Sequence, residues 1–334
     1  MKKFLSLLMA TLMMASVLTA CGEKKEEAPA ETPAETPAET PAATGSELTF
    51  TTGGSSGTYY AFGSVLAGQI SSSTGTKVTA VEGKGSQGNI ELMDMEGAQL
   101  GLVQSDVMSY AYDGTNLFAE IGKVDSFSTV AALYMEQVQI VTMNPDIKTV
   151  EDLRGKSVSI GALGSGVYFN AVDVLGCYDM TIDDITPVYQ SFGDSADSLK
   201  DGKIDAAFIV AGAPTTAITD LSTSGQVYLV SIDDEHVDKL LAASPYYSKY
   251  TVSADTYGMP EDAQTVAVAA MILARNDVSE DAIYTFVSTI FDNADQLQHG
   301  KAAELSLEFA SSISSVPYHP GAARYFAEKG FDVA

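Results

Sequence analysis

The sequence predicts an α/β fold with two similarly built lobes, each a mixed sheet flanked by helices, and a cleft between them. Strand and helix signals alternate along most of the chain, which is typical of sheets covered by helices. A strand, a glycine-rich loop and a helix begin near residue 48, and a second such unit follows 109 residues later. The 334 residues are enough for two ordinary domains, and the 46% of hydrophobic residues rules out a wholly disordered protein.

The first unit begins at the start of the globular part. Residues 48–51 favour a strand, and residues 53–58 form a loop of glycine, serine and threonine. Apolar residues then recur at helical spacing, which predicts a helix whose buried face contains Tyr59, Phe62, Leu66 and Ile70. A loop of this kind before a helix presents free backbone N–H groups to an anion. No lysine follows its last glycine, so it is not a Walker loop.

The second unit has a strand at residues 157–160, a loop at 161–166, and then a helix. We expect this helix to end at a capping glycine, Gly176, and to bury a face made of Tyr168, Ala171, Val172 and Leu175. The two units match at Ser56 and Ser165, Gly57 and Gly166, Tyr59 and Tyr168, Tyr60 and Phe169, Val65 and Val174, and Leu66 and Leu175. Buried-strand candidates at 97–103 and 202–208 also recur in the same order, which favours two similar lobes.

The site is expected where the two glycine loops meet, because ligands of open α/β sheets bind beyond the carboxyl ends of the strands. Two helix N-termini can hold carboxylates without a side-chain cation. The candidate segments 51–62, 104–112, 161–170 and 209–217 contain no lysine or arginine. Lys84, in a nearby glycine-rich stretch, is interpreted as a solvated loop residue in preference to a ligand contact. After each loop we expect the first aromatic residue, Tyr59 or Tyr168, to contact the ligand, and the second, Tyr60 or Phe169, to pack in the core.

The charge of the chain limits its partners. Asp and Glu number 44 against 18 Lys and Arg, a net charge of −26. Nucleic-acid binding requires clustered basic residues, so it is not expected. A bare anionic membrane surface would repel the protein for the same reason.

The N-terminus predicts export. Lys2 and Lys3 precede 17 uncharged residues, which end in Leu-Thr-Ala before Cys21. This pattern is similar to a bacterial lipobox, so we expect residues 1–20 to be a lipoprotein signal peptide and Cys21 to be lipidated. A transmembrane anchor is the alternative. The expected location is extracytoplasmic, lipid-anchored to the cell membrane, on a cell surface or in a periplasm.

Residues 21–47 are expected to be a disordered linker, because Glu-Thr-Pro-Ala repeats three times and cannot bury a core. With Cys21 lipidated, Cys177 is the one free thiol, and we expect it to pack in the interior without reacting.

No catalytic pattern is visible in the sequence. His236, His299 and His319 have no metal-ligand spacing, and there is no Gly-x-Ser-x-Gly elbow, Walker lysine or paired-carboxylate motif. Asp106 could serve as a base, but a loop-capping aspartate is the favoured interpretation. His319 is interpreted as a structural residue near the C-terminal helix. We therefore expect a protein that is not an enzyme and uses no metal and no cofactor.

Several segments together resemble the TAXI-type solute-binding proteins of TRAP (tripartite ATP-independent periplasmic) transporters. They are residues 52–60, 103–106, 152–161, 189–193, 201–208 and 317–326, and the resemblance extends over nearly all of 48–331. It implies the periplasmic-binding-protein fold (type II-like), with ligand captured between the lobes. It also implies delivery to a membrane permease driven by an ion gradient, usually of sodium. Ligands of that family are glutamate, related amino acids and dicarboxylates such as 2-oxoglutarate.

The resemblance also implies which residues bind the ligand. From the first lobe these are Ser56, Gly57, Thr58, Tyr59, Ser86, Gln104 and Ser105. From the second lobe they are Ser165, Gly166, Val167, Tyr168 and Gly212. The family usually has threonine where this chain has Val167, and the missing hydroxyl indicates a less polar ligand than glutamate.

The expected organisation follows from two apolar segments where the chain crosses between lobes, near residues 139–144 and 266–273. Lobe 1 is then residues 48–140 plus 266–334, and lobe 2 is residues 141–265. We expect a monomer that binds a small carboxylate-bearing solute and docks on TRAP permease subunits. An ABC-type substrate-binding protein and a ligand-sensing surface antigen of the same fold are the alternatives.

Overall fold

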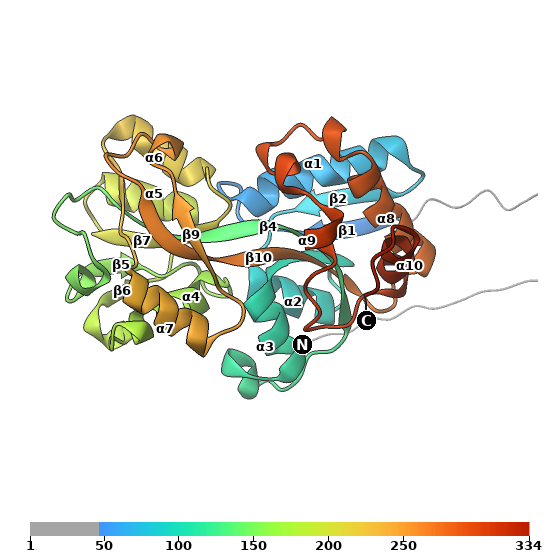
Figure 1. The fold of residues 1–334 in the computed structure, drawn as a ribbon, viewed down its shortest axis with the longest axis horizontal. Helices are drawn as coiled ribbons and strands as arrows, with labels where there is room; N and C mark the ends of the chain where they lie inside the picture. Colours follow the sequence, from blue (N-terminus) through green and yellow to red (C-terminus); the bar gives the residue numbers. More distant parts are fainter. Residues whose placement is uncertain (1–46, 334) are drawn as a thin grey trace, which may run out of the picture. The chain divides into compact units, whose positions relative to one another are not determined.

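A computed structural model describes residues 47–333 of the chain (Figure 1). The signal peptide predicted at 1–20, the lipidation predicted at Cys21 and nearly all of the predicted linker lie outside the described residues. Within residues 47–333, no helix is both long and apolar enough to span a bilayer.

One mixed sheet of ten strands forms the centre of the fold, in the order β2-β1-β3-β10-β4-β7-β5-β6, with β8 beside β4 and β9 beside β10. The strands are β1 (Glu47–Thr51), β2 (Lys77–Val81), β3 (Leu100–Gln104), β4 (Phe127–Thr142), β5 (Ser157–Ser159), β6 (Thr186–Val188), β7 (Ala206–Ala211), β8 (Tyr228–Leu229), β9 (Ser248–Val252) and β10 (Ala263–Arg275). Parallel pairs join β1 to β2 and β3, and β5 to β6 and β7.

The two longest strands, β4 and β10, are shared by the whole sheet. They pair antiparallel, from Phe127 opposite Arg275 to Gln137 opposite Ala267. At one end β10 pairs with β3, and at the other end β4 pairs with β7. We call β1, β2 and β3 with their covering helices the first half, and β5, β6 and β7 with theirs the second half.

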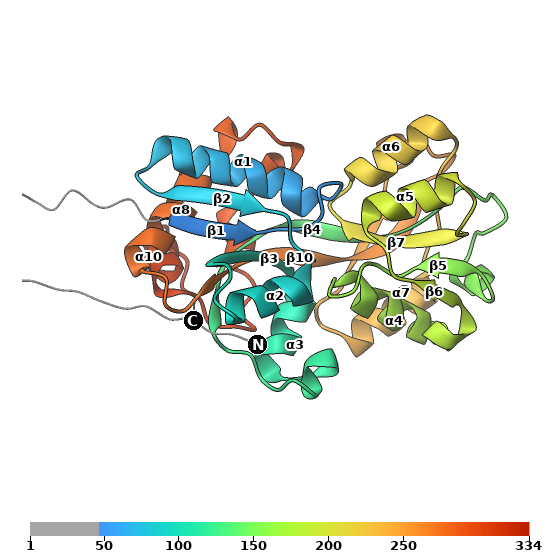
Figure 2. The ribbon, with the colours of Figure 1, turned by 180° about the vertical axis from the view of Figure 1, so that it is seen from behind.

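Helices cover both faces of each half (Figures 1 and 2). In the first half they are α1 (Thr58–Ser73), α2 (Ser86–Asp94), α3 (Ser105–Asp113), α8 (Glu280–Asp292), α9 (Leu307–Ala310) and α10 (Pro320–Glu328). In the second half they are α4 (Val167–Cys177), α5 (Phe192–Lys200), α6 (Thr216–Ser224) and α7 (Asp234–Ala243). Short 3-10 turns lie at η1 (Asn116–Ala119), η2 (Val150–Leu153), η3 (Ile182–Asp184), η4 (Ala254–Thr256), η5 (Ala294–Gln296) and η6 (Gly300–Glu304).

The core consists of two layers on each half, because side chains alternate between the two faces of a strand. On β7, Phe208 packs toward α4 and α7, whereas its neighbour Ile209 packs toward α5 and α6. On β10, Ile272 packs toward α1, α8 and α10, whereas Met271 packs toward α2 and α3. Strands buried on both faces need continuous apolar sequence, which explains why β4 and β10 are apolar along most of their length.

Each of the two long strands contributes side chains to the core of one half over part of its length and to the core of the other half over the rest. Along β4 the change falls between Tyr134 and Val138, and along β10 between Val268 and Ala269. The lobe boundaries predicted at residues 140 and 266 lie inside these same strands. The two connections are therefore continuous strands and not loops.

The first predicted unit is confirmed in detail. β1 precedes α1, and the expected buried face of α1 is buried, with Phe62, Leu66 and Ile70 fully covered.

The second unit follows the same order, but two details of its helix are wrong. Val172 is 39% exposed, because α4 turns Val167 and Val174 toward the sheet instead. Gly176 lies in the last turn of α4, and Tyr178 caps it. Several apolar faces were compatible with the helical spacing here, and packing against the sheet selected one.

Candidate functional site

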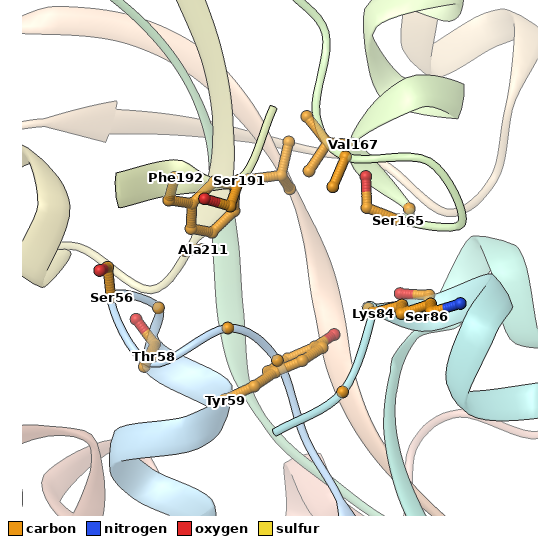
Figure 3. Close-up of a pocket in the computed structure, with 18 of the residues that line it drawn as sticks. Ser56, Thr58, Tyr59, Lys84, Ser86, Ser165, Val167, Ser191, Phe192 and Ala211 are labelled. Atoms are coloured by element: carbon orange, nitrogen blue, oxygen red, sulfur yellow. The ribbon is translucent and has the colours of Figure 1, made fainter. Parts of the chain in front are cut away.

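A pocket of about 320 Å³ lies where loops of the two halves meet (Figure 3). This volume is near the lower end of the roughly 300–1,000 Å³ usual for ligand sites, so it suits a small solute. The first half and β4 contribute Gly53, Gly54, Ser55, Ser56, Gly57, Thr58, Tyr59, Glu82, Gly83, Lys84, Gly85, Ser86, Gln104 and Glu136. The second half contributes Ala162, Leu163, Ser165, Gly166, Val167, Gln190, Ser191, Phe192, Gly193, Val210 and Ala211.

Five helices follow directly on a residue of the pocket lining. One of them is α3, which follows Gln104, and its first N–H groups already meet the carboxyl of Asp106 in its first turn. The residue before α1 is Gly57, the residue before α2 is Gly85 and the residue before α4 is Gly166, and no side chain caps any of these three helices. The first N–H groups of a helix have no partner inside the helix, and its dipole places partial positive charge there. The fifth helix, α5, is capped by Ser191, whose hydroxyl accepts from the Asp194 N–H at 3.2 Å. Three N-termini with neither a side-chain cap nor an acidic residue in the first turn therefore border one small pocket, which favours an anionic ligand group.

Glycine is required where the halves approach each other most closely. A Cβ on Gly166 would lie 1.4 Å from Oε1 of Gln104, which belongs to the other half. Gly85 has a φ of +95°, in the region that glycine adopts without strain, and a Cβ there would lie 3.0 Å from the Cα of Ser165. No larger residue fits at the first position in this arrangement.

Direct hydrogen bonds also join the halves around the pocket. The Thr58 hydroxyl donates to the Gly212 carbonyl at 2.9 Å, and the Ala217 N–H donates to the Ser56 carbonyl at 3.2 Å. On the opposite rim, the Gly88 N–H donates to the Gly164 carbonyl at 2.9 Å. The structure therefore shows the two halves in contact on both sides of the pocket.

A buried polar network extends from the pocket between the halves. Gln104 accepts from the Ser86 hydroxyl at 3.3 Å and donates from Nε2 to Oδ1 of Asn170 at 2.7 Å. Asn170 in turn donates to Oδ2 of Asp106 at 3.0 Å and to the Tyr247 hydroxyl at 2.8 Å. Burial raises the pKa of Asp106 to about 7, and the neighbouring Asp173 adds to this rise.

Glu136 is the one fully buried carboxyl in the pocket lining, and it lies in the middle of β4 with 2% exposure. The Tyr59 hydroxyl donates to its Oε2 at 2.5 Å. Its other oxygen, Oε1, has no hydrogen bond to any described residue. Burial raises the pKa of Glu136 to about 8, against smaller lowering effects of Tyr59 and Lys301.

Two further polar atoms of the lining have no hydrogen-bond partner among the described residues. They are Oγ of Ser165 and Oε1 of Gln190, and both are buried. Buried polar atoms are nearly always paired, so such atoms at a pocket indicate a partner from the ligand or from solvent. Among the same residues, no group of His, Cys, Asp and Glu side chains could hold a metal ion.

The structure brings together most of the predicted ligand-binding residues. Ser56, Gly57, Thr58, Tyr59, Ser86, Gln104, Ser165, Gly166 and Val167 all line the pocket. Lys84, interpreted from the sequence as a solvated loop residue, also lines it, and its side chain is exposed. Figure 3 shows Ser165 and Val167 across the pocket from Tyr59.

Three predicted residues lie outside the lining. The Ser105 hydroxyl accepts from the Ala269 N–H at 3.2 Å, so it ties α3 to β10. The Tyr168 ring stacks on Tyr189, with centroids 6.4 Å apart, and Tyr168 is not among the lining residues. Gly212 lies beside Lys301, and its carbonyl accepts from Thr58.

Sequence reasoning also missed lining residues. Gln190, Ser191, Phe192 and Gly193 lie at the start of α5, in a segment that the resemblance included without assigning a role to it. Glu136, also in the lining, belongs to none of the sequence motifs described above. The sequence does carry a feature that could have indicated Glu136, because it is the single charged residue in the 16 residues of β4. Asp106 lies in the first turn of α3 and not in a loop, and it is outside the lining.

Solved structures resemble this chain in fold. MatC from Rhodopseudomonas palustris, solved with bound malate, is 14% identical, with a TM-score of 0.52 and coverage of 77% of this chain and 86% of MatC. A protein from Bordetella bronchiseptica RB50 is 16% identical, with a TM-score of 0.51 and coverage of 85% and 81%. The alkanesulfonate-binding protein SsuA from Xanthomonas axonopodis pv. citri is 17% identical, with a TM-score of 0.47 and coverage of 85% and 83%.

The mixed sheet, the flanking helices and the likeness to MatC and to the Bordetella protein confirm the predicted fold class, that of the periplasmic binding proteins. At the level of sequence, the model of the NMT1-like family matches residues 50–330, nearly the whole of the described chain. The chain belongs to the NMT1-like family.

Proposed function

We propose that this protein is an extracytoplasmic solute-binding lipoprotein that captures a small carboxylate-bearing solute between its two halves. The observation that carries the proposal is the meeting of three uncapped helix N-termini at one pocket, with no lysine or arginine in the lining except the exposed Lys84. Backbone N–H groups bind carboxylates without the desolvation cost of a buried cation. The malate bound to MatC, a protein of similar fold, supports a carboxylate ligand.

The proposed cycle follows from the contacts between the halves. Hydrogen bonds such as Thr58 to Gly212 form only when the halves meet, and a ligand that touches both halves stabilises that state. Opening would be a hinge motion absorbed in β4 and β10. This role needs no catalytic group, so we propose a carrier and not an enzyme.

The proposed partner is a TRAP-type membrane permease, and this step rests on the resemblance of the sequence to TAXI-type proteins. An ABC-type substrate-binding protein is the alternative, together with a ligand-sensing surface antigen. A gene for TRAP membrane subunits beside this one would support the first partner, whereas a neighbouring transport ATPase gene would favour the second. Lipidation at Cys21 is tested by mass spectrometry of the protein isolated from cells.

The test of the carrier role is a thermal-shift screen of the purified protein, unfolded and refolded beforehand to remove bound ligand. A ligand at about 100 times its Kd adds about 2.7 kcal/mol to the free energy of unfolding. For a domain of this size the midpoint should rise by about 4–5 °C. Ser165→Ala should reduce the rise, because the hydroxyl lines the pocket without a protein partner. Ser244→Ala is the matched control, since Ser244 is a buried serine outside the lining. The absence of any shift with carboxylates would refute the proposal.

A further inference from the structure

The pocket lining differs in chemistry between its two sides. Every residue contributed by the first half and β4 is either glycine or carries a polar group. All of the purely apolar side chains come from the second half, and they are Ala162, Leu163, Val167, Phe192, Val210 and Ala211. A ligand that fills this pocket therefore meets a polar wall on one side and a largely apolar wall on the other.

The polar wall carries groups for both signs of charge. The N-termini of α1 and α2 favour an anionic group. Beside them, Oε2 of Glu136 is held by the Tyr59 hydroxyl, while Oε1 has no hydrogen bond to any described residue. Glu136 is a buried residue that lines the pocket, and a cationic ligand nitrogen would offset the cost of burying its charged form.

We propose that Glu136, positioned by Tyr59, is the binding group for the ammonium of an α-amino acid whose side chain is apolar. The carboxylate of this ligand lies at the uncapped helix N-termini, and its side chain packs against the apolar wall around Val167 and Phe192. The inference rests on the proposed carrier function, and it names the class of solute. It excludes keto acids and dicarboxylates as the preferred ligands, because they have no ammonium to pair with Glu136.

The protonation of Glu136 supplies a direct signature of such binding. The groups that act on it are Tyr59 from α1, Asp106 from α3 and Lys301 from η6. Its pKa of about 8 in the unliganded pocket means that most molecules carry the proton at pH 7. An ammonium bound against the carboxyl lowers that pKa, so binding should release nearly one proton. A ligand that brings only negative charge raises the pKa and releases none.

The experiment compares ligand pairs that differ only at the nitrogen. Affinities of the purified protein are measured by calorimetry for L-leucine against 4-methyl-2-oxopentanoate, L-valine against 3-methyl-2-oxobutanoate, and L-glutamate against 2-oxoglutarate. Each titration is run at pH 7 in two buffers of different ionisation enthalpy, which reports the protons released. We expect the apolar amino acids to bind most tightly and to release protons.

Two variants make the test specific to Glu136. Glu136→Gln keeps the shape but removes the charge, and it should weaken amino-acid binding by at least about thirty-fold while leaving the keto acids unaffected. Glu261→Gln is the matched control, because Glu261 is an exposed glutamate outside the pocket lining. The melting temperature of each unliganded variant shows that it is folded.

The outcomes separate this inference from the carrier function. Tight binding of keto acids or dicarboxylates, with amino acids weak or unaffected by Glu136→Gln, overturns the ammonium site and leaves a carboxylate carrier. Equal losses in Glu136→Gln and Glu261→Gln also overturn it. If none of the six carboxylates binds, both the inference and the carrier function fail.

Discussion

Gly166→Ala should separate the two halves at the pocket. The added Cβ would lie 1.4 Å from Oε1 of Gln104, whereas ordinary contacts of this kind are about 3.4 Å or longer. Gln104 cannot turn away freely, because it is 2% exposed and hydrogen-bonds both Ser86 and Asn170. Either Gln104 gives up these bonds, or the halves move apart.

The magnitude depends on which of the two adjusts. Overpacking costs about 1–3 kcal/mol, and each lost hydrogen bond costs about 1 kcal/mol. If Gln104 moves and loses both bonds, the free energy of unfolding should fall by about 3–5 kcal/mol. If the halves separate, stability changes less, but the ligand loses contacts and its affinity should fall at least about tenfold.

Denaturant unfolding and ligand titration together measure both adjustments. Gly176→Ala, at the other end of α4, is the matched control, since nothing lies within 4 Å of its added Cβ. In a Gln104→Ala background the closest remaining neighbour of the added Cβ would be Oγ of Ser86, at 2.8 Å, so Gly166→Ala should have a much smaller effect. If Gly166→Ala alone leaves both stability and affinity unchanged, the close approach of the halves described above does not exist in solution.

Three further predictions follow from buried groups. Burial raises the pKa of Asp106 to about 7 and of Glu136 to about 8. The folded protein therefore holds these two protons more tightly than the unfolded chain, and this stabilisation is full only below the unfolded pKa near 4. The free energy of unfolding of the unliganded protein should therefore fall as the pH rises from 5 to 8, by up to about 1.4 kcal/mol per pH unit for each carboxyl. A free energy of unfolding that rises over this range would contradict the raised pKa values. Burial also raises the pKa of the Cys177 thiol, so in a Cys21→Ser variant a thiol reagent at pH 7.5 should label it only after denaturation, and rapid labelling of native protein would show the site is open. His319→Ala should lower the free energy of unfolding by about 1–2 kcal/mol, because Nδ1 of His319 accepts from the Gly321 N–H at the start of α10. His319→Asn should restore most of this loss in denaturant unfolding.

Much of the fold could be predicted from local sequence. The strand–loop–helix order of β1 and α1 follows from side-chain spacing, and so does the buried face that contains Phe62 and Leu66. Alternation of strands and helices predicts the fold class without any knowledge of pairing partners. The face of α4 could not be predicted in the same way, because Val172 and Val174 are equally apolar and only contact with the sheet distinguishes them.

Some features of the candidate site could likewise be predicted from local sequence, and others could not. Helix N-termini are encoded locally by their glycines, so the sequence by itself determined that residues such as Gly57 and Gly166 would offer backbone N–H groups to an anion. Only the tertiary structure decided that Glu136 faces them. Its position depends on the pairing of β4 with β10 and on the hydrogen bond from Tyr59, which is 77 residues away in the chain. Local spacing carries information over a few residues, whereas the burial of a charge is set by everything that packs around it.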